Sequence, residues 1–322
     1  MRRQLRQIKK GIRRHIHPEL YPWGSILMLH RIDNIDPDRL WYNEHLKISP
    51  SFLDDTLSKL QKRGFSFVPL DELADIINRK KKTRRIISIT LDDGYKDNYT
   101  NGLPIFKAHN VPFCIYVATK LPEKKMTYWW YLLEDIIQQK KSITLSDGSN
   151  FICHSKQEKE QAFLDIREKI LTIPHDNFNE HFAELFPDID IDLNRYNDTL
   201  PLTWKMLLQL SKDPLATIGC HTHSHGSFAT CTNKSIIEDI EYSKHLMQTK
   251  ANVTMHHFAF PFGDDIAVRP EHISLIRELG FNTISTTQEG LLYYSTDLQQ
   301  LPRVFFTEHN ASAIIEKIHH EC

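Results

Sequence analysis

The segment RIISITLDDGY, residues 85–95, sets a run of strand-forming residues directly before two adjacent carboxylates. Residues 86–90 are mostly apolar and β-branched, which is typical of a buried strand. Neighbouring side chains of an extended chain leave it on opposite sides. Asp92 and Asp93 can therefore take different roles, one as a metal ligand and the other as a general base facing a water molecule.

The rest of the chain alternates strands with helices. Such alternation predicts an α/β fold, with a parallel sheet or barrel covered by helices. Residues from about 120 to 200 depart from this pattern and are expected to form a mostly helical insertion with a short hairpin around Asp147 and Gly148. Strands are expected near residues 24–32, 86–90, 111–119, 215–221, 255–263 and 281–287.

The composition is that of a globular chain of enzyme size. Its 322 residues are 40% hydrophobic and 25% charged, and residues 21–322 are assigned to one domain. Lys and Arg number 40 against 41 Asp and Glu, so the overall charge gives no reason to expect nucleic acid as a partner. The five cysteines include no CxxC pair, which indicates scattered reduced thiols.

The first 20 residues form a separate basic segment. Leu5, Ile8, Ile12 and Ile16 recur at spacings of three and four among many Lys and Arg, which predicts a basic amphipathic helix at residues 1–20. This helix would either contact an anionic membrane surface or pack its apolar stripe on the domain. Neither a signal-peptide core nor an apolar run of roughly 20 residues is present. A cytoplasmic location is expected, with peripheral contact at the inner face of the membrane.

A second polar cluster, HTHSH at residues 221–225, follows another expected strand. Its spacing can bring His221 and His225 onto one ion in a helical turn or a tight loop. Two imidazoles and one carboxylate leave open positions on a divalent ion, as in catalytic zinc or iron sites. Each motif alone is weak, because Asp-Asp-Gly is often a turn and a His-rich loop is often surface. Their joint occurrence at strand ends favours a hydrolytic metal centre.

Four segments resemble motifs of the polysaccharide deacetylase, or NodB-homology, family. TLDDGY (90–95) resembles the first motif and IGCHTHSH (218–225) the second. FAFPFG (258–263) stands in place of the third motif, and LPRV (301–304) resembles the late arginine segment of many members. The resemblance covers roughly residues 24–306 apart from the insertion. It implies a distorted (β/α)7 barrel with the site at the C-terminal ends of the strands.

The resemblance also implies roles for individual residues. Asp92 would be the general base. Asp93, His221 and His225 would hold a divalent metal, with Zn2+ favoured and Co2+, Ni2+ or Fe2+ as alternatives. His223 matches a variable position and receives no role. Tyr95 and Pro261 lie within the matching motifs and are further candidate site residues.

This sequence departs from the family pattern in two places. Many members carry an Arg in the third motif that orients the base, whereas this chain has Ala259, and Arg303 is a candidate replacement. Many members also carry a late His that protonates the leaving group. Neither His319 nor His320 fits that motif well.

His30 is another candidate for the general acid. The segment MLHRI (28–32) resembles the first strand of poly-N-acetylglucosamine deacetylases, in which the early His is placed to act as the acid. A buried His at a strand end is otherwise usually structural, so both interpretations stand. Asp33 could orient the imidazole. Trp129, Trp130, Tyr131 and Trp204 would provide either a stacking surface for a sugar ring or core packing.

Three functions are consistent with these residues. The first is metal-dependent removal of an N-acetyl group from a hexosamine of a glycan, or of a lipid- or nucleotide-linked precursor in lipopolysaccharide, capsule or exopolysaccharide biosynthesis. The second keeps the metal site but removes a formyl group, cleaves another amide or removes an O-acetyl group. The third is a catalytically silent glycan-binding protein. The intact set of Asp92, Asp93, His221 and His225 argues against the third.

Overall fold

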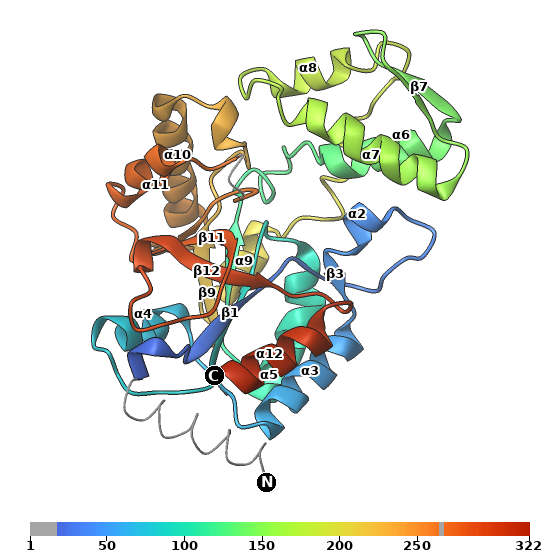
Figure 1. Cartoon of the computed structure of the whole chain (residues 1–322). Helices are drawn as coiled ribbons and strands as arrows, with labels where there is room; N and C mark the ends of the chain where they lie inside the picture. Colours follow the sequence, from blue (N-terminus) through green and yellow to red (C-terminus); the bar gives the residue numbers. More distant parts are fainter. Residues whose placement is uncertain (1–17, 264–266) are drawn as a thin grey trace.

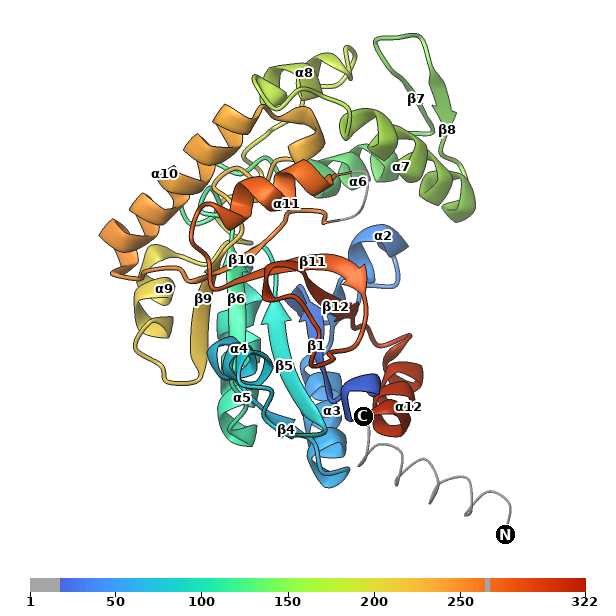
Figure 2. The ribbon, with the colours of Figure 1, turned by 60° about the vertical axis from the view of Figure 1, so that its left-hand side comes forward.

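The protein is a closed barrel of parallel strands, described by a computed structural model over residues 18–263 and 267–322. Within these ranges the ring consists of β1 (Gly24–Leu29), β5 (Ile86–Leu91), β6 (Phe113–Val117), β9 (Ala216–Cys220), β10 (His257–Ala259), β11 (Thr283–Glu289) and β12 (Leu301–Phe305). Pairing runs from β1 through β12, β11, β10, β9 and β6 to β5, and β5 pairs with β1 again (Figures 1 and 2). The predicted distorted (β/α)7 barrel is confirmed.

Two neighbouring strands of the ring, β1 and β5, explain why apolar runs stand out in the sequence. β1 and β5 are buried along their whole length and pair from Gly24 with Ile86 to Leu29 with Leu91. A strand covered on both faces has no polar side, so it appears in the sequence as a continuous apolar run. The short strand β4 (Ser66–Phe67) pairs beside the start of β5.

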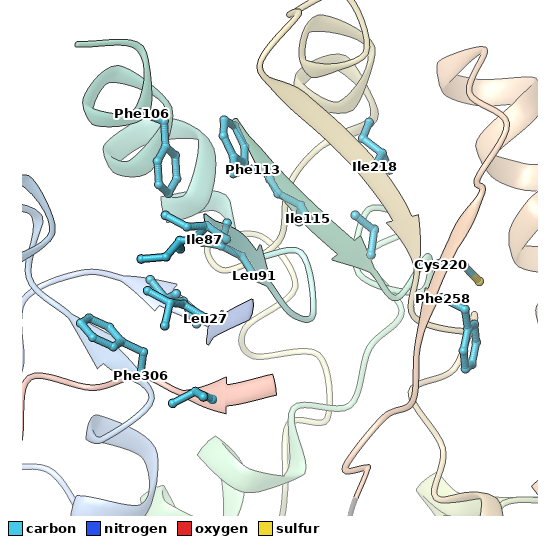
Figure 3. Close-up of a cluster of buried hydrophobic side chains, with 14 of the residues drawn as sticks. Leu27, Ile87, Leu91, Phe106, Phe113, Ile115, Ile218, Cys220, Phe258 and Phe306 are labelled. Carbon is cyan, nitrogen blue, oxygen red and sulfur yellow. The ribbon is translucent and has the colours of Figure 1, made fainter. Parts of the chain in front are cut away.

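Alternate side chains of the strands form two different cores. The outward set packs under the helices, as where Phe106 stacks on Phe113 with ring centres 4.4 Å apart, and Figure 3 shows this cluster. The inward set includes polar groups: Tyr116 on β6 bonds Ser285 on β11 at 3.0 Å, across the barrel. The surrounding helices are α3 (Pro50–Lys62), α4 (Leu70–Asn78), α5 (Leu103–His109), α9 (Trp204–Leu210), α10 (Asn233–Ala251), α11 (Pro270–Arg277) and α12 (Ala311–Glu321).

The basic helix expected at residues 1–20 falls mostly outside the described residues, which begin at residue 18. Pro18–Leu20 forms a short 3-10 turn, η1. In the part of the chain that the structure describes, no helix combines the length and the hydrophobicity needed to cross a bilayer.

The insertion lies over the C-terminal ends of the barrel strands, at the upper right of Figure 1. It contains α6 (Trp129–Gln139), the hairpin β7 (Ser142–Thr144) and β8 (Asn150–Ile152), α7 (Lys156–Ile170) and α8 (Phe178–Glu184). Ser155 and Glu158 form a capping box that starts α7. The insertion has its own cluster of buried apolar side chains, separate from the barrel core.

Two buried polar networks attach the insertion to the barrel. Arg31, on the short strand β2 (Arg31–Ile32), donates to Asp97 at 2.8 Å and to the hydroxyl of Tyr131 on α6 at 2.9 Å. Glu134, fully buried on α6, accepts from Asn43 at 2.6 Å. Asn43 belongs to α2 (Trp41–Glu44), which precedes β3 (Lys47–Ile48). Because buried charges are stable only when they are paired, these contacts hold α6 at one position above the barrel.

Truncation of the insertion core should destabilise the fold. Ile166 on α7 is fully buried, so Ile166→Ala is expected to lower the free energy of unfolding by about 2–5 kcal/mol through lost burial and a cavity. Chemical denaturation followed by circular dichroism measures the change. Glu168→Ala, exposed on the same helix, should stay within about 0.5 kcal/mol of the wild type. Equal stability of both variants would contradict the assignment of this core.

Candidate metal centre and active site

Three side chains converge where β5 and β9 end. The Nε2 atom of His225 lies 3.0 Å from Oδ1 of Asp93, and that of His221 lies 3.4 Å from the same oxygen. One ligand atom from each residue lies within 4.8 Å of the others. Asp93 and His225 both adopt left-handed backbone conformations, with φ of 75° and 56°. This conformation is uncommon outside glycine and is concentrated at functional sites.

The donor set fits a divalent cation. Nδ1 of His221 lies 2.8 Å from the carbonyl oxygen of Ala259, which can only accept, so Nδ1 carries the hydrogen. In the neutral imidazole Nε2 then presents a lone pair to the Asp93 carboxylate. Two electron-rich atoms so close together call for a cation between them, and a carbonyl that orients the far ring nitrogen is usual for metal-binding His.

The electrostatics of the site keep Asp93 ionised. Burial opposes ionisation of this carboxyl group, but the electrostatic influence of the two neighbouring imidazoles, that of His225 above all, outweighs burial and holds the pKa of Asp93 well below its usual range. An ionised carboxylate is the form that binds a metal.

Asp92 is held by Arg303 in a two-pronged ion pair. Nη1 and Nη2 of Arg303 donate to the two carboxylate oxygens at 2.6 and 2.8 Å, and Nε donates to the carbonyl of Thr286 at 2.9 Å. Arg303 is fully buried and Asp92 nearly so. Burial raises the pKa of Asp92, but Arg303 outweighs it and lowers the pKa overall. The pair therefore presents an ionised carboxylate in a fixed orientation.

His30 lines the same cavity as Asp92 and the candidate metal triad. Its ring meets Phe305 edge-on with centres 5.8 Å apart, and its buried Nδ1 has no hydrogen-bond partner among the described residues. Burial lowers the pKa of His30. Asp33, a candidate to orient this imidazole, instead forms an ion pair with Arg31 at 3.3 Å.

The site opens into a cavity of about 400 Å³ between the barrel and the insertion. Trp130 of α6 forms one wall: its ring lies 5.7 Å from that of His225, and its Nε1 donates to the Tyr95 hydroxyl at 3.2 Å. The barrel contributes His30, Asp92, Asp93, Tyr95, His221 and His225, and the insertion contributes Trp129, Trp130, Phe163 and Arg167.

Other residues singled out in the sequence take different positions. Pro261 is buried and precedes Phe262, whose ring lies 5.0 Å from His225. His223 turns away from the candidate metal triad and bonds Thr119 at 2.9 Å. Trp204 donates to Glu123 outside the cavity, and Tyr131 is buried against Arg31. His319 and His320 lie on α12 and are not among the described residues that line the cavity.

Four further residues line the cavity that the sequence pattern did not indicate. Tyr42, His45, Phe163 and Arg167 all line it. The first two lie between β2 and α3, and the others lie on α7. No local signal marks them, because an Arg on a charged helix usually faces solvent and an apolar residue usually serves the core.

The chain belongs to the polysaccharide deacetylase family, whose sequence model matches residues 79–284. The predicted enzyme class, a carbohydrate deacetylase, is confirmed by this match. No curated protein matches the chain in sequence.

Solved deacetylase structures share the fold. The Streptococcus pyogenes deacetylase PplD, solved with acetate, has a TM-score of 0.61 at 16% identity, over 92% of this chain and 99% of that one. IcaB from Ammonifex degensii has a TM-score of 0.59 at 16% identity, over 92% and 97%. A de-N-acetylase from Aggregatibacter actinomycetemcomitans has a TM-score of 0.57 at 14% identity, over 92% and 99%.

If Asp93 and His225 are metal ligands, their loss should be visible in metal affinity alone. We expect Asp93→Ala and His225→Ala each to weaken Zn2+ binding by more than the roughly 10- to 100-fold that loss of an outer-shell partner costs. Competition with a chromogenic chelator measures this affinity. His223→Ala is the matched control, since His223 lies in the same loop but bonds Thr119. Unchanged affinity in both ligand variants would rule out this site.

The buried ion pair should matter for stability as well. Arg303→Met leaves a buried carboxylate without its partner, so the free energy of unfolding should fall by about 3–5 kcal/mol. The double variant Asp92→Asn/Arg303→Met removes both charges and should recover part of that loss. Urea denaturation compares the three proteins. A double variant less stable than Arg303→Met would show that the unpaired charge is not the cause.

Proposed function

We propose that this protein removes the N-acetyl group of a hexosamine in a glycan or glycan precursor, using a divalent ion, with Zn2+ favoured over Co2+, Ni2+ or Fe2+. The observation that carries the proposal is the position of an Arg-bound carboxylate, Asp92, next to the triad of Asp93, His221 and His225. One group can accept a proton while the neighbouring three hold an ion, which is what hydrolysis of an unactivated amide requires.

Each residue has a distinct part in the proposed reaction. A divalent ion held by the triad would polarise the acetyl carbonyl and lower the pKa of a water molecule to about 7. Asp92 accepts the proton of the attacking water, while Arg303 keeps the carboxylate ionised and oriented. His30 gives a proton to the leaving nitrogen. The products are acetate and a free amine.

The proposed setting is the cytoplasm, at the inner face of the membrane. There the enzyme would act on saccharides being assembled for lipopolysaccharide, capsule or exopolysaccharide. The seven Lys and Arg among the first fourteen residues support contact with an anionic surface.

Acetate release tests the proposal. The purified protein with added Zn2+ is incubated with N-acetylhexosamine oligosaccharides and with lipid- and nucleotide-linked precursors, and acetate is measured enzymatically. We expect metal-dependent release that falls by about 10²–10⁴-fold in Asp92→Asn and in His30→Gln, because proton transfer by a positioned side chain contributes that much. His223→Ala should retain activity. Release of formate from formylated analogues, with no acetate from any acetylated sugar, would show that the enzyme removes a formyl group and would contradict the proposed deacetylation.

A further inference from the structure

Arg167 lies on the wall of the catalytic cavity and has no side-chain partner among the described residues. It is half-buried on α7 and faces the cavity from the insertion, whereas the reacting groups face it from the barrel. Phe163, one helical turn earlier on the same face, also lines the cavity and stacks in parallel on Tyr42 at 5.6 Å. The surroundings of the guanidinium on this wall are therefore largely apolar.

The other cations of α7 each have a hydrogen-bond partner in the protein and lie away from the cavity. Lys156 donates to the carbonyl of Pro37 at 2.8 Å, Lys159 to Gln138 at 2.8 Å, and Lys169 to Asp147 at 2.7 Å. These three lysines are not part of the cavity wall. Within the described residues, Arg167 is the cation of this helix that forms neither an ion pair nor a side-chain hydrogen bond with the protein.

The carboxylates that line the cavity do not neutralise Arg167. Asp92 is bound at both oxygens by Arg303, and Asp93 lies between the two imidazoles of the triad. The described lining contains no other Asp or Glu. A guanidinium presents a planar fork that matches a carboxylate or phosphate, and charges attract more strongly beside apolar walls than in water.

We propose that Arg167 binds an anionic group, phosphate or carboxylate, on the saccharide whose acyl group lies at Asp92, and so selects charged substrates over neutral ones. This inference rests on the proposed deacetylation. The phosphate of a lipid- or nucleotide-linked sugar and the carboxylate of an acidic sugar share the chemistry that Arg167 recognises. Either would bridge the cavity from the insertion to the barrel.

Matched substrates test the proposal. The kcat/KM for acetate release is compared for N,N'-diacetylchitobiose, N-acetylglucosamine 1-phosphate, UDP-N-acetylglucosamine and a disaccharide of N-acetylglucosamine with glucuronic acid. Arg167→Gln should lower kcat/KM for the preferred anionic substrate by roughly 10- to 150-fold, the effect of one charged hydrogen-bonded contact. The neutral disaccharide should change less than about threefold, and Arg167→Lys should recover part of the loss. The anionic substrate whose kcat/KM falls most in Arg167→Gln shows whether Arg167 binds a phosphate or a carboxylate.

Controls separate a local effect from a general one. Lys169→Gln removes a charge of the same sign from α7 outside the cavity and should leave the ratio of anionic to neutral kcat/KM unchanged. Equal losses on neutral and anionic substrates in Arg167→Gln, or no loss on any anion, would overturn the inference.

If the wild type releases acetate neither from these compounds nor from the wider panel of oligosaccharides and linked precursors, the proposed function fails and binding decides the inference. Calorimetric titration with N-acetylglucosamine 1-phosphate should then show binding that is lost in Arg167→Gln and kept in Lys169→Gln. Absent binding, or equal binding in wild type and Arg167→Gln, would overturn the role of Arg167 independently of catalysis.

Discussion

A guanidinium and a carboxylate meet inside the barrel, where Arg303 of β12 binds both oxygens of Asp92 at the end of β5. Neither charge could remain buried alone, because desolvation of an unpaired ion costs several kcal/mol. The pair forms only when β1 lies between β5 and β12 and the ring is closed. The pairing of β1 with both strands therefore places Arg303 where it keeps Asp92 ionised.

The candidate metal triad depends on another set of neighbouring strands in the ring. Asp93 lies one residue beyond Asp92, and its left-handed backbone turns it toward the loop that follows β9. That loop reaches the site because β9 pairs with β6 and β6 pairs with β5, which places the C-terminal ends of the three strands side by side. The carbonyl of Ala259, at the end of β10, then fixes the ring of His221.

The insertion turns this open barrel end into a cavity with two chemically different walls. Barrel residues supply the candidate reacting groups, whereas α6 and α7 supply aromatic rings and Arg167, which has no side-chain partner among the described residues. Arg31 and Glu134 tie α6 to the barrel through buried hydrogen bonds. The insertion wall of the cavity is thus positioned by contacts that do not include the candidate reacting groups, and such a wall can vary without change in those groups.

Local patterns in the amino-acid sequence were enough to place the main strands and the polar residues at their ends. Strands buried on both faces appear as apolar runs, and the motifs that follow β5 and β9 are contiguous, so Asp92, Asp93, His221 and His225 stand out from the sequence pattern. The likeness to a family made Arg303 a candidate as well. Three features arise only in the folded chain: the contact of Arg303 with Asp92, which is 211 residues away, the partner of Asp33, and the position of Arg167 on the cavity wall. The reason is that local patterns record burial and backbone conformation, whereas contacts between distant segments exist only once the ring closes and the insertion packs upon it.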